Sequence, residues 1–284
     1  AGLANTTGYN NLFAGVSAGD SNTTGALNAL SGSFSGATNT TGSYNTAYGA
    51  ESLYSNTTAS NNTALGYQAG YSNTTGADMV ALGKGALKLS TVGNGNTAVG
   101  NNALTSSTTP SNNTALGDNA GAANTTGSNN TIIGKQALQA NTTASNNTAV
   151  GYQASLNATT GAVNTFVGGL SAGLGVVTGS HNVGLGAETL YRLTSGGSNV
   201  SIGYQALQFN TTGSSNIAIG REALESNTTA SDNTAVGYQA GFSTTTGGEN
   251  SYFGRFSGKG LTTGAGNVST RRRRQRARRW RQLG

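Results

Sequence analysis

The sequence predicts an all-β protein built as one parallel β-solenoid, with about sixteen coils of seventeen residues each. Three observations lead to this fold class: the motif Asn-Thr-Ala-Val-Gly returns at a fixed interval, small and polar residues dominate, and no segment holds a helical period. A period this short is typical of coils that stack on one another around a common axis, because an independent domain needs far more residues.

The period is set by the glycine of the motif. Thirteen of the fourteen steps between successive motif glycines, from Gly15 to Gly254, have the same length of seventeen residues. The step from Gly168 to Gly186 is longer by one residue, and Gly169 is the expected insertion. A longer repeat is superimposed, because the segment that begins at Asn56 returns almost unchanged at residues 141 and 227. We interpret this as duplication of five-coil blocks, each of eighty-five residues.

The composition excludes several functional classes. The 45 Gly, 42 Thr, 34 Asn and 30 Ser together exceed half of the 284 residues, and only 8% of the chain is charged. Such residues do not build the core of an ordinary globular enzyme. Without Cys there is no disulfide or thiolate metal site, and no apolar run reaches the roughly 20 residues of a membrane span. We expect no cofactor.

The columns of the repeat are numbered from the first residue of Asn-Thr-Ala-Val-Gly, as positions one to seventeen. Position one is Asn in fifteen of sixteen coils, with Met79 as the exception, which predicts a ladder of side-chain amides. Positions two and four carry Thr, Val, Leu or Ile, and we expect them to share the inward face of a strand. Position eight is always small, as in Ala69 and Ser257.

Each coil is predicted to hold two short strands, near Asn-Thr-Ala-Val-Gly and near Gln-Ala-Leu, joined by two tight turns. The coil closes on Asn-Thr-Thr-Gly, where Ala59, Ala144, Ala230 and Pro110 replace the glycine and show that a positive φ is not required there. Sixteen coils at about 4.8 Å give a rod about 75 Å long. A rod this thin buries little apolar area, so we expect a partner surface, and hence an oligomer.

The chain divides at residue 270. Residues 1–270 form the repeat domain, which begins inside a repeat unit and is interpreted as a fragment or processed product. Residues 271–284 carry eight of the 15 basic residues, so the repeat domain has seven basic and nine acidic residues, a net charge of about −2. We expect this tail to be disordered by self-repulsion.

Two interpretations of the tail remain. It could anchor an anionic surface or nucleic acid through Arg271, Arg272, Arg273, Arg274 and Trp280. It could instead result from a shift of reading frame or a gene-model error, which its abrupt start in mid-coil favours. Nucleic acid is not an expected partner of the repeat domain itself.

The repeat resembles known surface proteins. Asn-Thr-Ala-Val-Gly followed by a small residue resembles the head repeats of trimeric autotransporter adhesins, and Asn-Thr-Ala-Val-Gly-Tyr-Gln-Ala-Leu with Asn-Thr-Thr-Gly is similar to repeats of phage tail fibres. The resemblance covers about residues 5–270. It implies a left-handed parallel β-roll, a trimer of chains, and surface display or attachment outside the cell or on a virion. The period of seventeen is longer than that of the adhesin heads.

The first functional hypothesis is accordingly a non-enzymatic surface fibre or adhesin. Tyrosines at position six stand beside glutamines at position seven, and stacked rings and amides could bind a surface glycan or a protein. The simpler alternative is that they are outward residues that favour β structure. The candidate surface-binding residues are Tyr67, Gln68, Tyr152, Gln153, Tyr204, Gln205, Tyr238 and Gln239.

The second hypothesis is an ice-binding solenoid that uses stacked Thr pairs. Its candidate residues are Thr23, Thr24, Thr125, Thr126, Thr211 and Thr212. Neighbouring residues of a strand point to opposite faces, whereas ice-binding solenoids space their Thr one residue apart on one face, which counts against the pairs.

A third hypothesis is a filament that grows by stacking coil ends, because neither end has an obvious cap. Enzyme activity is not expected. His181 has no neighbouring carboxylate, and Glu51, Glu188 and Glu222 share a column but lie many coils apart.

Overall fold

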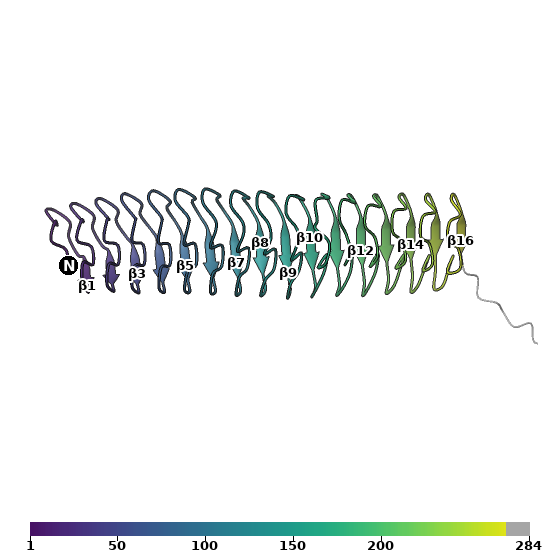
Figure 1. Ribbon diagram of the computed structural model, residues 1–284, viewed down its shortest axis with the longest axis horizontal. Coiled ribbons are helices and arrows are strands. Elements are labelled where there is room, and N and C mark those ends of the chain that lie inside the picture. The colour runs from purple at the N-terminus through teal and green to yellow at the C-terminus, as the bar shows by residue number, and fades with distance from the viewer. Residues whose placement is uncertain (271–284) are drawn as a thin grey trace, which may run out of the picture.

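The computed structural model describes residues 1–270, which form one straight rod of stacked coils (Figure 1). Sixteen strands of three residues pair in chain order in one parallel sheet, which confirms the predicted parallel β-solenoid. The candidate tail residues Arg271, Arg272, Arg273, Arg274 and Trp280 lie outside the described residues. The strands are β1 (Leu12–Ala14), β2 (Ala29–Ser31), β3 (Thr46–Tyr48), β4 (Thr63–Leu65), β5 (Val80–Leu82), β6 (Thr97–Val99), β7 (Thr114–Leu116), β8 (Thr131–Ile133), β9 (Thr148–Val150), β10 (Thr165–Val167), β11 (Val183–Leu185), β12 (Val200–Ile202), β13 (Ile217–Ile219), β14 (Thr234–Val236), β15 (Ser251–Phe253) and β16 (Val268–Thr270).

The strand pairing confirms the seventeen-residue coil. Thr63 of β4 pairs with Val80 of β5, and only the β10–β11 pair, Thr165 with Val183, has an offset that is longer by one. Gly169 is not the inserted residue, because its carbonyl accepts the Glu188 amide as position six does in regular coils. The regular pattern continues through Leu174, whose amide donates to the Tyr191 carbonyl at 2.9 Å, and returns at Thr178, so the extra residue lies between Leu174 and Thr178.

Each coil has one strand and not the predicted two. The Gln-Ala-Leu segment does bond to the neighbouring coils, as when the Leu104 amide donates to the Ala120 carbonyl at 3.0 Å. However, positions seven and nine adopt positive φ, with φ of 58° at Gln136 and 47° at Leu138. A left-handed residue at every second position turns the backbone away from the extended conformation, so this segment is a series of turns.

The strand also presents to the core the face opposite to the one predicted. Position three points inward, with Ala64, Ala81 and Ala98 fully buried, while positions two and four point outward. The physical reason is the narrow coil: an inward column must lie opposite positions eight and nine, and a large side chain fits there only where the residues across the core are small. The β-branched and aliphatic columns are therefore on the surface.

The core keeps a similar volume along the rod by exchanging large and small residues between position three of one coil and position nine of the coil before it. Where position three is Ala, the preceding position nine is often a buried Leu, as in Leu104 before Ala115. Where position three is Tyr252, glycines stand opposite, and a Cβ at Gly258 would lie 2.3 Å from the Tyr252 ring. In most layers of the core, therefore, one large side chain from either column faces a small one from the other.

Two ladders of buried asparagines connect the coils, one at position one and a second, interrupted one at position twelve, and the first confirms the predicted amide stacking. At position one, the backbone amide of Asn45 donates to Oδ1 of Asn28, one coil earlier, at 2.9 Å. At position twelve, Asn39 Nδ2 donates to Oδ1 of Asn22 at 2.8 Å and to the Gly42 carbonyl at 2.9 Å. The side chain of Asn28 donates to that same carbonyl, so both ladders hold the Thr-Thr-Gly turn. These bonds satisfy polar groups that burial would otherwise penalise.

The motif glycine is required by its backbone. Gly100 has a φ of 137°, and a Cβ there would lie 2.4 Å from the Gly117 carbonyl oxygen. Glycine at this position lets the chain turn out of the strand while successive coils remain a strand's width apart. The Gly at the end of Asn-Thr-Thr-Gly has no positive φ in Gly25 or Gly42, as the Ala and Pro replacements indicated.

Candidate functional surfaces

The first candidate surface is the outward side of the sheet, called here the strand face and formed by positions two and four of all sixteen strands. Thr or Val is the commonest residue at position two, and aliphatic residues dominate position four. The large exposed side chains on it include Tyr48, Leu65, Leu116, Ile133, Val167, Leu185, Ile217, Ile219 and Phe253.

The strand face carries no charged residue in any of its strands. Sixteen strands at about 4.8 Å and three residues at about 3.3 Å define a strip of roughly 750 Å². Monomeric proteins seldom expose apolar patches beyond roughly 300–600 Å². Thr occupies position two in eight strands, so the apolar part of this strip is mainly the row of position four. An uncharged apolar row of this length is typical of an interaction surface.

The strand face was missed by sequence reasoning, although a signal was present. Position three is Ala in eight of the sixteen coils and large in only a few, whereas position four is mostly Leu, Ile or Val. In a thin coil the small column belongs inside. The ordinary rule that apolar residues point inward gave the opposite orientation.

The second candidate surface is position six, where the structure places all four predicted tyrosines at the surface. Tyr67, Tyr152 and Tyr204 are exposed and Tyr238 is half-buried. They lie beside the strand face, each directly after a motif glycine. The tyrosines of this column, together with the residues between them, form a strip along the rod that we call the tyrosine column.

The predicted glutamines do not project freely beside the tyrosines. Each one donates from Nε2 to position seven of the preceding coil: Gln68 to Glu51 at 2.7 Å, Gln153 to Gln136 at 2.9 Å and Gln205 to Glu188 at 2.8 Å. Gln239 bonds to Glu222 in the same way. The glutamines therefore bind their neighbours along the rod and support the tyrosine column from beside it.

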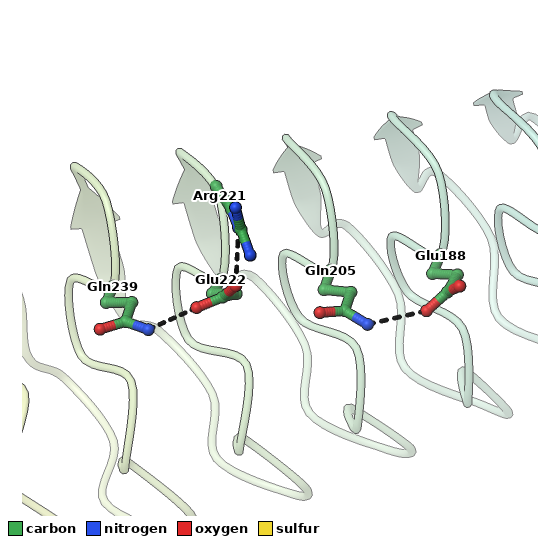
Figure 2. Close-up of polar contacts among 5 residues, drawn as sticks. All are labelled: Glu188, Gln205, Arg221, Glu222 and Gln239. Carbon is green, nitrogen blue, oxygen red and sulfur yellow. Dashed lines mark hydrogen bonds and ion pairs between the residues drawn. The ribbon is translucent and has the colours of Figure 1, made fainter.

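Glu222 is the most constrained carboxylate of this region. Gln239 donates to one of its oxygens and Nε of Arg221 donates to the other at 2.7 Å (Figure 2). The hydrogen bond from Gln239 lowers the pKa of Glu222 despite its burial, and the Arg221 contact lowers it further. Glu225 behaves oppositely, because desolvation and the charge of Glu222 raise its pKa.

The Thr pairs do not form two columns of exposed hydroxyls. The first Thr of each pair donates its hydroxyl to the carbonyl of the equivalent Thr one coil later: Thr23 to Thr40 at 3.0 Å, Thr125 to Thr142 at 2.8 Å and Thr211 to Thr228 at 3.0 Å. Only the second members, Thr24, Thr126 and Thr212, are exposed, and they lie in a turn. The pairs thus act mainly as internal connections between coils.

The groups considered for chemistry are scattered along the rod. His181 is exposed at a turn with a φ of 63°. Glu51, Glu188 and Glu222 each bond to a glutamine of the next coil rather than to one another. Within residues 1–270, no three His, Asp or Glu side chains gather in a way that could hold a metal ion. The same residues include no helix that could span a membrane.

No protein-family model matches the chain, and no curated protein matches it.

Proposed function

We propose that this protein is a non-enzymatic fibre of a cell surface or virion, in which several copies pack along their strand faces and the remaining sides serve attachment or display. The strand face is the observation that carries the proposal. Its roughly 750 Å² strip is close to the ~800 Å² that each partner buries in a standard protein interface. A homotrimer is the assembly expected from the resemblance to adhesin heads and tail fibres.

Periodicity favours another copy of this chain as the partner. Position four carries a large apolar side chain in every strand from Tyr48 of β3 to Phe253 of β15, and most of these side chains are exposed. A second rod has the same spacing along its whole length, so that its side chains can pack between those of the first coil after coil. The lack of charge removes any desolvation penalty for ionised groups.

Light scattering on the purified chain tests the proposal. We expect a mass of two or more chains, with three favoured. Leu116→Glu and Ile133→Glu together should dissociate it into monomers, because two buried carboxylates would face an apolar partner. Leu89→Glu is the matched control, since Leu89 is 44% exposed, close to the 48% of Leu116, but lies on a different side of the coil.

A monomer for the unmodified chain would contradict the fibre proposal. Masses that rise steadily with concentration would instead favour end-to-end filaments. The double variant must stay folded for its result to count, which circular dichroism establishes.

A second candidate function, ice binding, is favoured by a different set of threonines from the predicted pairs. Position two is Thr in eight strands, among them β6 to β10, and none of these hydroxyls has a hydrogen-bond partner among residues 1–270. They form one outward Thr column, and position four beside it on the same face carries mainly aliphatic residues. A monomeric chain that shows thermal hysteresis, with Thr114→Lys and Thr148→Lys abolishing it, would support this candidate over the fibre.

A further inference from the structure

The basic residues of the repeat domain occupy one side of the rod. All seven stand at positions six, ten or eleven: Lys84, Lys88, Lys135, Arg192, Arg221, Arg255 and Lys259. Four of them fall in the tyrosine column itself. Every tyrosine of the column has a basic residue one coil away, namely Lys84 after Tyr67, Lys135 before Tyr152, and Arg221 between Tyr204 and Tyr238.

The contacts between cations and aromatic rings in this strip centre on Arg221. The Arg221 guanidinium carbon lies 5.5 Å from the Tyr204 ring centre and 6.0 Å from that of Tyr238, so the cation contacts both rings. Arg255 lies 5.5 Å from the Tyr238 ring on the next coil. Aromatic and guanidinium groups thus alternate over four successive coils.

The polar groups beside this strip are held in place before any ligand binds. Nε of Arg221 donates to Glu222, which is fixed in turn by Gln239, and Glu188 accepts from Gln205 (Figure 2). Glu188 also accepts from Gln208 at 3.0 Å. Groups that are ordered in advance lose less entropy on binding, which favours recognition at an otherwise exposed surface.

The charges of this strip nearly cancel. Arg221, Arg255 and Lys259 are matched by Glu188, Glu222 and Glu225. Nucleic acid binding needs an excess of positive charge along the path of the phosphates, which this strip does not offer. A ligand rich in hydroxyls suits it better, because sugar hydroxyls can accept from Arg221 and donate to the half-buried Glu188, and the apolar face of a sugar ring can contact the exposed ring of Tyr204.

We propose that the alternating strip Tyr204–Arg221–Tyr238, with its amide and carboxylate supports, binds a linear glycan that lies along the rod. The strip repeats at about 4.8 Å per coil, so it presents a line of equivalent groups rather than a pocket, and a polymer of sugar rings matches that geometry. The inference rests on the proposed attachment function and names the class of ligand for it.

The test is affinity electrophoresis of the full chain through gels that contain either a neutral galactomannan or anionic alginate. We expect retardation by the galactomannan, and an affinity about tenfold lower for the double variant Tyr204→Ser, Tyr238→Ser. The control is Tyr9→Ser, Tyr44→Ser, because both tyrosines are exposed but lie on another side of the coil. Arg221→Gln should weaken binding as well.

Three outcomes would overturn the glycan strip: no retardation in either gel, equal retardation of the Tyr204/Tyr238 variant and the unmodified chain, or retardation only in alginate that salt abolishes, which is attraction by charge alone. Light scattering on the same samples separates this result from the fibre proposal. Retardation by a monomeric chain would leave the strip standing without the fibre, whereas an oligomer without retardation would leave the fibre without the strip.

Discussion

At the scale of single residues, the rod depends on polar groups that are buried and bonded in columns. The position-twelve ladder is broken where Ser90 and Ser107 replace Asn between Asn73 and Asn124. Oδ1 of Asn73 and the hydroxyls of both serines are buried without a hydrogen-bond partner in the described part of the chain. Such groups retain the desolvation penalty of burial without the bond that would offset it.

Completing this ladder should stabilise the protein. In the double variant Ser90→Asn, Ser107→Asn, each new amide can donate to the preceding Oδ1 and to its own turn carbonyl, as Asn56 and Asn73 do. We expect a gain of about 1 kcal/mol for each new ladder bond, seen as a higher urea midpoint. Ser106→Asn, at a half-buried neighbouring position, should leave the midpoint nearly unchanged. A lower midpoint for the double variant would show that the column cannot accept amides here.

The carboxylates near Arg221 make a second prediction at this scale. Since its pKa is lowered, Glu222 should titrate below the ordinary value of 4.5, while Glu225 should titrate above 4.5. The stabilising contribution of Glu222 is therefore complete above pH 4.5 and is lost as the pH falls through its lowered pKa. Glu225 acts oppositely, because ionisation above its raised pKa opposes folding.

Carbon-detected NMR titration of the two side-chain carboxyls measures this difference directly. In Glu222→Gln the pKa of Glu225 should fall toward 4.5 but remain above it, because desolvation is the larger cause of its shift. Coincident titration of Glu222 and Glu225 in the unmodified chain would contradict the arrangement in Figure 2.

At the scale of the coil, the strand and its opposing turns are coupled by volume. Gly121 stands against Ile132 of the next coil, and a Cβ on Gly121 would lie 2.7 Å from the Ile132 Cδ1 atom. One coil earlier the equivalent pair is Leu and Ala, since the buried Leu104 precedes the buried Ala115. Leucines at position nine already adopt positive φ, for example 50° at Leu104, so the backbone at Gly121 can accept one.

A pair of substitutions at Gly121 and Ile132 should therefore replace the Gly–Ile arrangement of this layer by the Leu–Ala arrangement found elsewhere. Ile132→Ala alone should cost about 2–4 kcal/mol through the cavity it leaves. Adding Gly121→Leu should recover most of that loss, although Gly121→Leu alone should destabilise by overpacking. Urea unfolding of the four proteins of this cycle measures the coupling, and additive effects would rule out a shared layer of the core.

The coil was only partly predictable from sequence. The period, the parallel stacking, the Asn ladder and the small position-eight column followed from residues that recur at fixed spacing, and the structure confirms them. The orientation of the strand and the number of strands per coil could not be predicted in this way. Left-handed conformations at Gln136 and Leu138 are not suggested by those residue types, which rarely adopt positive φ unless neighbouring coils hold them there.

The candidate sites were likewise predicted only in part from the sequence. Tyr67, Tyr152, Tyr204 and Tyr238 reach the surface as predicted, because position six lies outside the core that positions three, eight and nine form. The glutamines and the first members of the Thr pairs form bonds to adjacent coils that sequence alone gave no means to assign. Whether the tyrosines bind a ligand stays a prediction.

At the scale of the whole molecule, coils are nearly equivalent units that contact only their neighbours, as Figure 1 shows. Whole coils should therefore be removable without loss of the fold. Deleting residues 66–150 removes five complete coils and joins Leu65 to a second Gly-Tyr-Gln-Ala segment at Gly151. The shortened chain should form a rod about 24 Å shorter, measured by small-angle X-ray scattering.

Register, not length, should decide the outcome of such a deletion. Removing residues 66–146 takes out slightly less of the chain and leaves Asn147 where a motif glycine is due. The amide ladders and the core columns would then be misaligned at the join, and we expect unfolding or aggregation near it. Equal behaviour of the two deletions would argue against a stack held by column alignment.

The asparagine ladders have a direction, and that direction bears on how the protein is made. At both positions the later coil donates and the earlier coil accepts, as in Asn28 to Asn11 and Asn22 to Asn5. During synthesis, each finished coil consequently presents oxygen acceptors to the coil that emerges after it. The rod can thus assemble vectorially on the ribosome, with the N-terminal coils acting as a template for the rest.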